Sequence, residues 1–126
     1  MLNPQNNKKR VIFLYSDTGG GHRSAAEAII EALELEYPGC FECEMVDFFE
    51  NYSPPPFNMA GPIYPVMSRM DHLWKFSFEV SDDPDRMRVI YAMFWPYVRL
   101  PLYKLLEKHP GDIFVSVHPL INIPLL

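Results

Sequence analysis

A single histidine stands beside a glycine-rich turn near the start of the chain. His22 directly follows Gly19, Gly20 and Gly21 within SDTGGGHRS, residues 16–24. An imidazole with an ordinary pKa of about 6.5 can accept a proton at neutral pH, so a histidine held over a cleft at this turn would suit general-base chemistry. The alternative is a histidine that only hydrogen-bonds the loop, and the spacing alone leaves both interpretations open.

The glycine turn matches neither of the two common phosphate-binding loops. Gly19 and Gly21 fill two positions of the dinucleotide fingerprint, but Ser24 stands where a third small residue is expected, and Asp47 follows later than the usual ribose-binding acid. No Gly-Lys-Ser/Thr follows, which excludes a Walker A loop. We nevertheless predict that Gly20 and Gly21 let the backbone approach a substrate, the alternative being a tight turn that needs glycine φ values.

The residues around this turn predict a strand before it and a helix after it. Val11–Tyr15 is a continuous apolar run, which is typical of a strand buried on both faces of a parallel sheet. From Ala26 to Tyr37 the apolar residues recur at helical spacing. Ser24 and Glu27 predict a capping box at the start of that helix.

The rest of the chain continues the alternation of strands and helices. The pattern predicts an edge strand over 41–46, a proline-stiffened loop over 48–65, a helix over 64–78, helical segments over 86–109 that Pro96 and Pro101 kink or divide, and a strand over 113–118. Strand–helix–strand units of this length build parallel sheets. The predicted fold class is therefore α/β, a Rossmann-like three-layer parallel sheet with helices on both faces.

The length of 126 residues, with 48% hydrophobic residues, suits one domain spanning residues 1–126. Three strands do not complete a doubly wound sheet, so we expect the chain to be the beginning of a longer protein. Polar side chains follow the last predicted strand, where ligand-binding groups of open α/β sheets collect. Ser116, His118 and Asn122 are therefore predicted to bind substrate, although a histidine before Pro119 can also simply shape the turn.

Composition excludes several classes of function. The net charge of −5 argues against a nucleic-acid groove, which needs clustered positive charge. Cys40 and Cys43 form a CxxC at the start of a predicted strand rather than of a helix, which favours structural, reduced thiols over a redox or zinc site. We predict no metal site. The polar and basic start of the chain is not a signal peptide, so a cytoplasmic location is expected.

Three segments carry a resemblance to a known family. The run LYSDTGGGHRSAAEAI, residues 14–29, resembles the opening of the monogalactosyldiacylglycerol (MGDG) synthases and processive diacylglycerol glucosyltransferases. Residues 64–78, with LWK at 73–75, and DIFVSVHPLIN, residues 112–122, resemble later segments of that family in the same order. The motif GGGH alone would also suit the related lipid-linked peptidoglycan glucosaminyltransferases.

The resemblance implies the N-terminal, acceptor-binding domain of a two-domain GT-B glycosyltransferase. The missing C-terminal domain would bind most of the UDP-sugar donor, and the residues that distinguish galactose from glucose would lie there. The implied reaction is an inverting, metal-independent transfer of a hexose to diacylglycerol without a cofactor. His22 would be the catalytic base that deprotonates the sn-3 hydroxyl, and the 126 residues alone are expected to be inactive.

Two other classes of function compete with this interpretation. A non-catalytic lipid-binding or interaction module would keep the same fold without the sugar-nucleotide domain. An NAD-type oxidoreductase would bind a nicotinamide dinucleotide at the glycine turn, although the poor fit of that turn to the fingerprint disfavours it.

Aromatic, methionine and basic residues are frequent between Pro54 and Trp95. No stretch is long and apolar enough to span a bilayer. We predict that Trp74, Trp95, Arg69 and Lys75 contact the lipid acceptor and an anionic membrane surface, which gives peripheral membrane association. The alternative is that this aromatic stripe belongs to the core.

Overall fold

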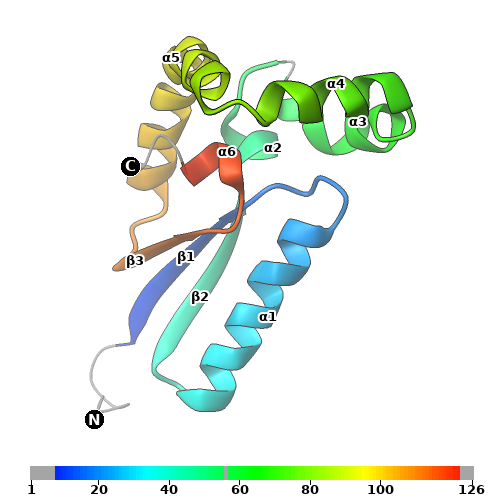
Figure 1. Cartoon of the computed structure of the whole chain (residues 1–126). Coiled ribbons are helices and arrows are strands. Elements are labelled where there is room, and N and C mark those ends of the chain that lie inside the picture. The colour runs from blue at the N-terminus through cyan, green and yellow to red at the C-terminus, as the bar shows by residue number, and fades with distance from the viewer. Residues whose placement is uncertain (1–7, 56, 123–126) are drawn as a thin grey trace.

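A computed structural model describes residues 8–55 and 57–122 of the chain. Figure 1 shows the elements in chain order. They are β1 (Lys9–Tyr15), α1 (Gly21–Glu36), β2 (Phe41–Asp47), α2 (Phe48–Tyr52), the 3-10 helix η1 (Phe57–Met59), α3 (Ala60–Met67), α4 (Asp71–Ser81), α5 (Pro84–Lys108), β3 (Ile113–Ser116) and α6 (Pro119–Asn122).

The strands form one parallel sheet in the order β2-β1-β3. Val11 of the central strand pairs with Cys43 on one side and with Ile113 on the other. The side chains from Val11 to Leu14 are buried, as expected for a strand with neighbours on both sides and helices on both faces. The predictions of a buried first strand and of β2 at the edge of the sheet are therefore confirmed.

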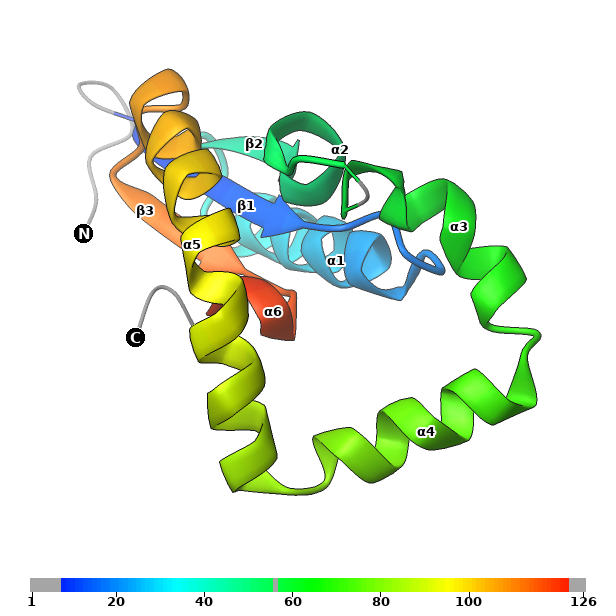
Figure 2. The same ribbon diagram turned by 90° about the horizontal axis from the view of Figure 1, so that it is seen from above.

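Alternate side chains of β1 point to opposite faces of the sheet, and each face has its own core. Val11 and Phe13 pack with Ala26 of α1. Ile12 and Leu14 belong to the second core, which α2, α5 and α6 complete with Phe48, Phe49, Leu102, Leu105 and Ile121. Figures 1 and 2 show α1 and α5 on opposite faces. The predicted Rossmann-like three-layer α/β class is confirmed.

The first helix begins earlier than the sequence predicted. Gly20, with a φ of 79°, is the N-cap residue of α1, and the helix starts at Gly21. Ser24 lies in the first turn, where its hydroxyl donates to the Gly20 carbonyl at 3.0 Å. The predicted capping box of Ser24 and Glu27 is therefore wrong, because the glycines allow the chain to turn directly into the helix.

The proline-rich part of the chain is more helical than the sequence predicted. The segment 48–65, predicted as a loop, contains α2 and most of α3, and Asp47 caps α2 by accepting from the Glu50 amide at 3.0 Å. The predicted helix over 64–78 is divided between α3 and α4. By contrast, α5 runs as one helix through Pro96 and Pro101, and its far end is held to the sheet by Leu102 and Leu105.

Helices α3, α4 and the first part of α5 extend away from the sheet, as Figure 2 shows. We call residues 60–100 the helical arm. Its exposed large apolar side chains are Val66, Met67, Met70, Leu73, Trp74, Phe76, Phe78, Val89, Met93, Phe94, Trp95, Tyr97 and Leu100. Among the described residues, no helix combines the length and the apolar character needed to cross a membrane.

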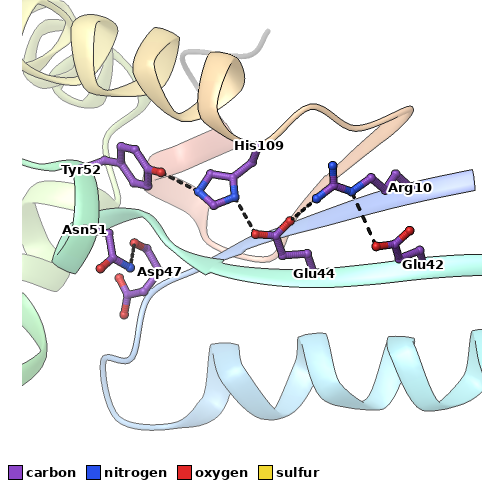
Figure 3. A network of polar contacts seen from close by, with 7 residues as sticks. All are labelled: Arg10, Glu42, Glu44, Asp47, Asn51, Tyr52 and His109. Carbon is purple, nitrogen blue, oxygen red and sulfur yellow. Dashed lines mark hydrogen bonds and ion pairs between the residues drawn. The ribbon is translucent and has the colours of Figure 1, made fainter.

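A polar network fastens the end of α5 to the sheet (Figure 3). Nδ1 of His109, which follows α5 directly, lies 2.6 Å from a carboxylate oxygen of Glu44 in β2. The other oxygen of Glu44 accepts from Arg10 in β1 at 3.0 Å. Because the carboxylate only accepts, Nδ1 carries a proton, and the other ring nitrogen, Nε2, is hydrogen-bonded to the Tyr52 hydroxyl. The network thus joins β1, β2, α2 and α5.

We predict that Glu44→Gln lowers the free energy of unfolding by about 1–2 kcal/mol, because the amide offers one acceptor oxygen where two donors need one each. The matched control is Glu42→Gln, since Glu42 lies on the same strand, is exposed and only approaches Arg10 at 4.0 Å. Urea denaturation measures both variants. Equal losses for the two would show that the network does not hold α5 in place.

Candidate active site at the carboxyl edge of the sheet

The three strands end at the same edge of the sheet, and the candidate site is built there. The glycine turn follows β1, Asp47 ends β2, and Val117 and His118 follow β3. Figure 1 shows the start of α1, α2 and α6 together at this edge. Ligands of open α/β sheets bind outside the carboxyl ends of the strands, so the topology brings the candidate residues to the expected place.

His22 lies in the first turn of α1 and is half-buried. Its Nδ1 is 2.9 Å from the carbonyl oxygen of Val117. A carbonyl oxygen can only accept, so Nδ1 carries the hydrogen, and in the neutral ring the lone pair is on Nε2. His22 therefore hydrogen-bonds the end of β3 and keeps one nitrogen able to accept a proton.

The glycines of the turn differ in the space around them. Gly19 has a φ of 74°, and a Cβ there would lie 2.7 Å from Cε1 of Tyr64, so only glycine fits against α3. Gly20 also has a positive φ, but a Cβ on Gly20 or Gly21 would meet no atom within 4 Å. The backbone at Gly20 and Gly21 is thus open to a ligand, and their role in substrate binding stays a prediction.

Asp47 holds the loop after β1 in place, a role the sequence did not reveal. The residue is buried, and its two carboxylate oxygens each accept from a backbone amide at 3.0 Å, one from Asp17 and one from Glu50. Sequence reasoning considered Asp47 only as a ribose-binding acid. An aspartate between a strand and a helix is also a common N-cap, and that signal could have found it.

His118 lies behind His22 rather than on the surface. Only 7% of the surface of His118 is exposed, and its ring centroid is 4.4 Å from that of His22 and 5.2 Å from that of Phe49. Burial, followed by the nearby His22, lowers the pKa of His118 to about 4. The imidazole of His118 is therefore neutral at physiological pH and places no positive charge beside His22.

Of the other predicted site residues, two lie near the edge of the sheet and four lie on the helical arm. The Ser116 hydroxyl lies at the edge, but it pairs with the backbone of His118, whose carbonyl it approaches at 3.3 Å. Asn122 lies in α6 with an exposed side chain. The four predicted membrane residues, Arg69, Trp74, Lys75 and Trp95, are exposed on the helical arm and not at the edge of the sheet.

Cys40 and Cys43 are free thiols. Burial raises the pKa of the Cys43 thiol, which is the opposite of what a reactive cysteine needs. Across residues 8–55 and 57–122, no three histidine, cysteine or acidic side chains lie together as a metal ion would require.

Comparisons with known proteins point to one family. Residues 22–126 match the family model described as monogalactosyldiacylglycerol (MGDG) synthase. The chain is 32% identical over 118 residues to a probable chloroplastic MGDG synthase of Nicotiana tabacum, covering 93% of the chain and 22% of that relative. The enzyme of Spinacia oleracea is 33% identical, again over 93% of the chain and 23% of the relative.

A further relative, the probable MGDG synthase 2 of Oryza sativa subsp. japonica, is 36% identical over 120 residues, with 93% of the chain and 25% of the relative covered. The chain thus spans about a quarter of the length of the curated relatives it matches. No solved structure matches it.

The depressed pKa of His118 predicts a pH-dependent stability. Between about pH 6.5 and pH 4 the unfolded chain takes up a proton that the buried ring cannot, so stability falls as the pH is lowered through this window, by up to ~1.4 kcal/mol per pH unit. His118→Phe should therefore lose less stability than the wild type between pH 7 and pH 5 in urea denaturation. His72→Phe, an exposed position on α4, is the control and should behave as the wild type. Identical pH dependence in His118→Phe and wild type would contradict the burial of a neutral His118.

Proposed function

This chain belongs to the monogalactosyldiacylglycerol synthase family, and from that premise we propose that it is the acceptor-binding domain of a diacylglycerol glycosyltransferase. The proposed donor is a UDP-hexose, with galactose the sugar that the relatives' names specify. A second domain, with which this one would complete a GT-B fold, is proposed to hold most of the donor. The acceptor is proposed to enter at the carboxyl edge of the sheet.

The single observation that supports this proposal most is the hydrogen-bonded state of His22. Its Nδ1–H is held by the Val117 carbonyl, so Nε2 is the proton acceptor. In the proposed reaction, the sn-3 oxygen of diacylglycerol bonds to the anomeric carbon as the bond from that carbon to the UDP oxygen breaks. The hydroxyl proton passes to Nε2, and inversion follows from attack on the face opposite UDP.

The surroundings of His22 suit the charge that this step creates. Once Nε2 is protonated, the ring is a cation whose Nδ1–H still donates to the Val117 oxygen, and such charge-assisted hydrogen bonds are stronger than neutral ones. The neighbouring His118 is neutral and adds no opposing positive charge. The open backbone at Gly20 and Gly21 directly precedes His22 in the chain and is proposed to contact the substrate.

We propose that the helical arm docks on the membrane that supplies the lipid. A row of aromatic rings joins the arm to the glycine turn. Tyr64 packs against Gly19. The ring centroid of Trp74 lies 6.3 Å from that of Tyr64 and 5.6 Å from that of Phe78, and both pairs meet edge to face. Tyrosine and tryptophan side chains, which combine an apolar ring with one polar group, favour the interface between headgroups and acyl chains. With Trp95 exposed on α5, the arm gives an apolar surface for peripheral association.

Arg69 and Lys75 are also exposed on the arm and are proposed to attract anionic lipid headgroups. The charge of Lys75 is partly offset by Glu79, whose carboxylate lies 3.9 Å away. The exposed apolar surface of the arm also favours a second candidate function, a lipid-binding module that performs no sugar transfer. The two functions share the membrane surface and differ in the role of His22. Kinetic tests of His22 therefore separate them.

In the complete enzyme, we predict that His22→Ala lowers kcat with UDP-galactose and diacylglycerol by about 100-fold to 10,000-fold, which is the usual contribution of a positioned base. Glu31→Ala, at an exposed position of the same helix α1, is the matched control and should retain wild-type kcat. Product chromatography measures transfer, and thermal unfolding checks that both variants fold. Near-wild-type kcat in folded His22→Ala contradicts the base role, whereas no transfer by the wild-type enzyme with any UDP-hexose favours the lipid-binding module.

We predict that Trp74→Ala combined with Trp95→Ala weakens binding to vesicles of phosphatidylcholine and phosphatidylglycerol by roughly tenfold, because two interfacial aromatic anchors are lost. The control combines Leu35→Ala with Tyr37→Ala, which removes exposed apolar side chains from the far end of α1. Co-sedimentation measures both. Equal binding by the arm variant and the wild type would contradict membrane docking through the arm.

A further inference from the structure

His118 contacts two aromatic rings at the edge of the sheet and is held there by its own backbone. Its ring meets that of His22 at an interplanar angle of 50° and that of Phe49 at 67°. The His118 carbonyl accepts from the amides of Ile121, at 3.0 Å, and Asn122, at 3.3 Å, where α6 begins. The Ser116 hydroxyl lies 3.4 Å from the His118 amide nitrogen, which donates to it. Backbone and ring are thus both fixed.

The His118 ring limits how far the His22 imidazole can rotate. A half-buried imidazole on the first turn of a helix can rotate about its side-chain bonds, and such a rotation would move Nδ1 away from the Val117 carbonyl that fixes its hydrogen. The Val117 carbonyl holds Nδ1 from one point only. A flat, rigid neighbour with its centroid 4.4 Å away restricts the remaining rotation, because a turned ring would collide with it.

We propose that His118 is a positioning residue for His22, whose buried ring packs against the His22 imidazole and, with the Val117 carbonyl, keeps Nε2 as the proton-accepting atom. This inference rests on the proposed base role of His22. It reassigns His118 from substrate binding to the support of the base, since the residue is buried behind His22. Val117 and His118 are consecutive, so one short segment after β3 supplies both constraints.

The strand supports this segment in turn. The Val117 amide donates to the carbonyl of Leu14 at 3.1 Å, so the last hydrogen bond of the β1–β3 pair lies next to the carbonyl that holds His22. Leu14 itself is fully buried. The His22 ring is therefore oriented by the sheet itself and by the ring of His118, and not by a loop alone.

The test that needs no activity uses the 126-residue chain with 15N-labelled imidazoles. Long-range proton–nitrogen NMR at a pH where His22 is neutral identifies which ring nitrogen carries the hydrogen. We expect wild-type His22 to be protonated on Nδ1, with contacts between the ring protons of His22 and His118. A wild-type His22 protonated mainly on Nε2 would overturn the inference, whatever the variants do.

Two substitutions of similar volume separate ring support from simple packing. His118→Phe keeps a flat ring and should keep His22 protonated on Nδ1. His118→Leu fills the same space without a ring and should give a mixture of the two tautomers, while His72→Leu leaves His22 unchanged. If His118→Leu folds and His22 stays protonated on Nδ1 alone, the positioning role is wrong.

Kinetics of the complete enzyme provide the second readout. Loss of orientation should lower kcat by about tenfold in His118→Leu with little change in KM, and His118→Phe should recover most of kcat. If His118 bound the substrate instead, both variants would raise KM. If His22→Ala proves fully active while His118→Leu still shifts the tautomer, the proposed function fails and the positioning of His22 by His118 stands.

Discussion

The hydrogen bond from His22 to the carbonyl of Val117 joins two segments that are 95 residues apart in the sequence, and the candidate site depends on it. It can form only if β1 and β3 are neighbours in register, since α1 starts just after β1 and Val117 just after β3. The buried side chains of β1, packed on both faces, stabilise that pairing. The same apolar residues that form the core therefore also set the tautomer of the histidine.

The molecule divides into a part that holds the site and a part that presents apolar surface. The sheet, α1, α2, α6 and the end of α5 share the two cores, and the network of Tyr52, His109 and Glu44 fixes the junction between α5 and the sheet. The helical arm has an exposed apolar surface. A rigid scaffold that orients His22, together with an apolar arm, suits the proposed enzyme, which would take a membrane lipid to a polar reaction.

The sequence predicted the parts of the fold that depend on local patterns. The strands, the first helix and the gathering of Gly20, Gly21, His22 and His118 at one edge followed from apolar periodicity and from the topology of parallel sheets. The helical residues between 48 and 63 were missed because proline was interpreted as a helix breaker. Long α5 passes Pro96 and Pro101, since each proline removes only one backbone hydrogen bond and packing of Leu102 and Leu105 stabilises the far end.

Tertiary contacts decide what the sequence did not predict. The sequence predicted His118 as a substrate ligand, and the proposal that it supports His22 depends on its burial beside Phe49, a residue far away in the chain. Likewise, no local pattern links Glu44 to His109.

The most direct measurement is a crystal structure of the complete enzyme with UDP and a non-reactive diacylglycerol analogue. We expect the sn-3 oxygen within hydrogen-bond reach of His22 Nε2, at about 2.6–3.2 Å, while Nδ1 stays bonded to the Val117 carbonyl. An acceptor oxygen held by another side chain, with Nε2 of His22 turned away from it, would contradict the base role of His22.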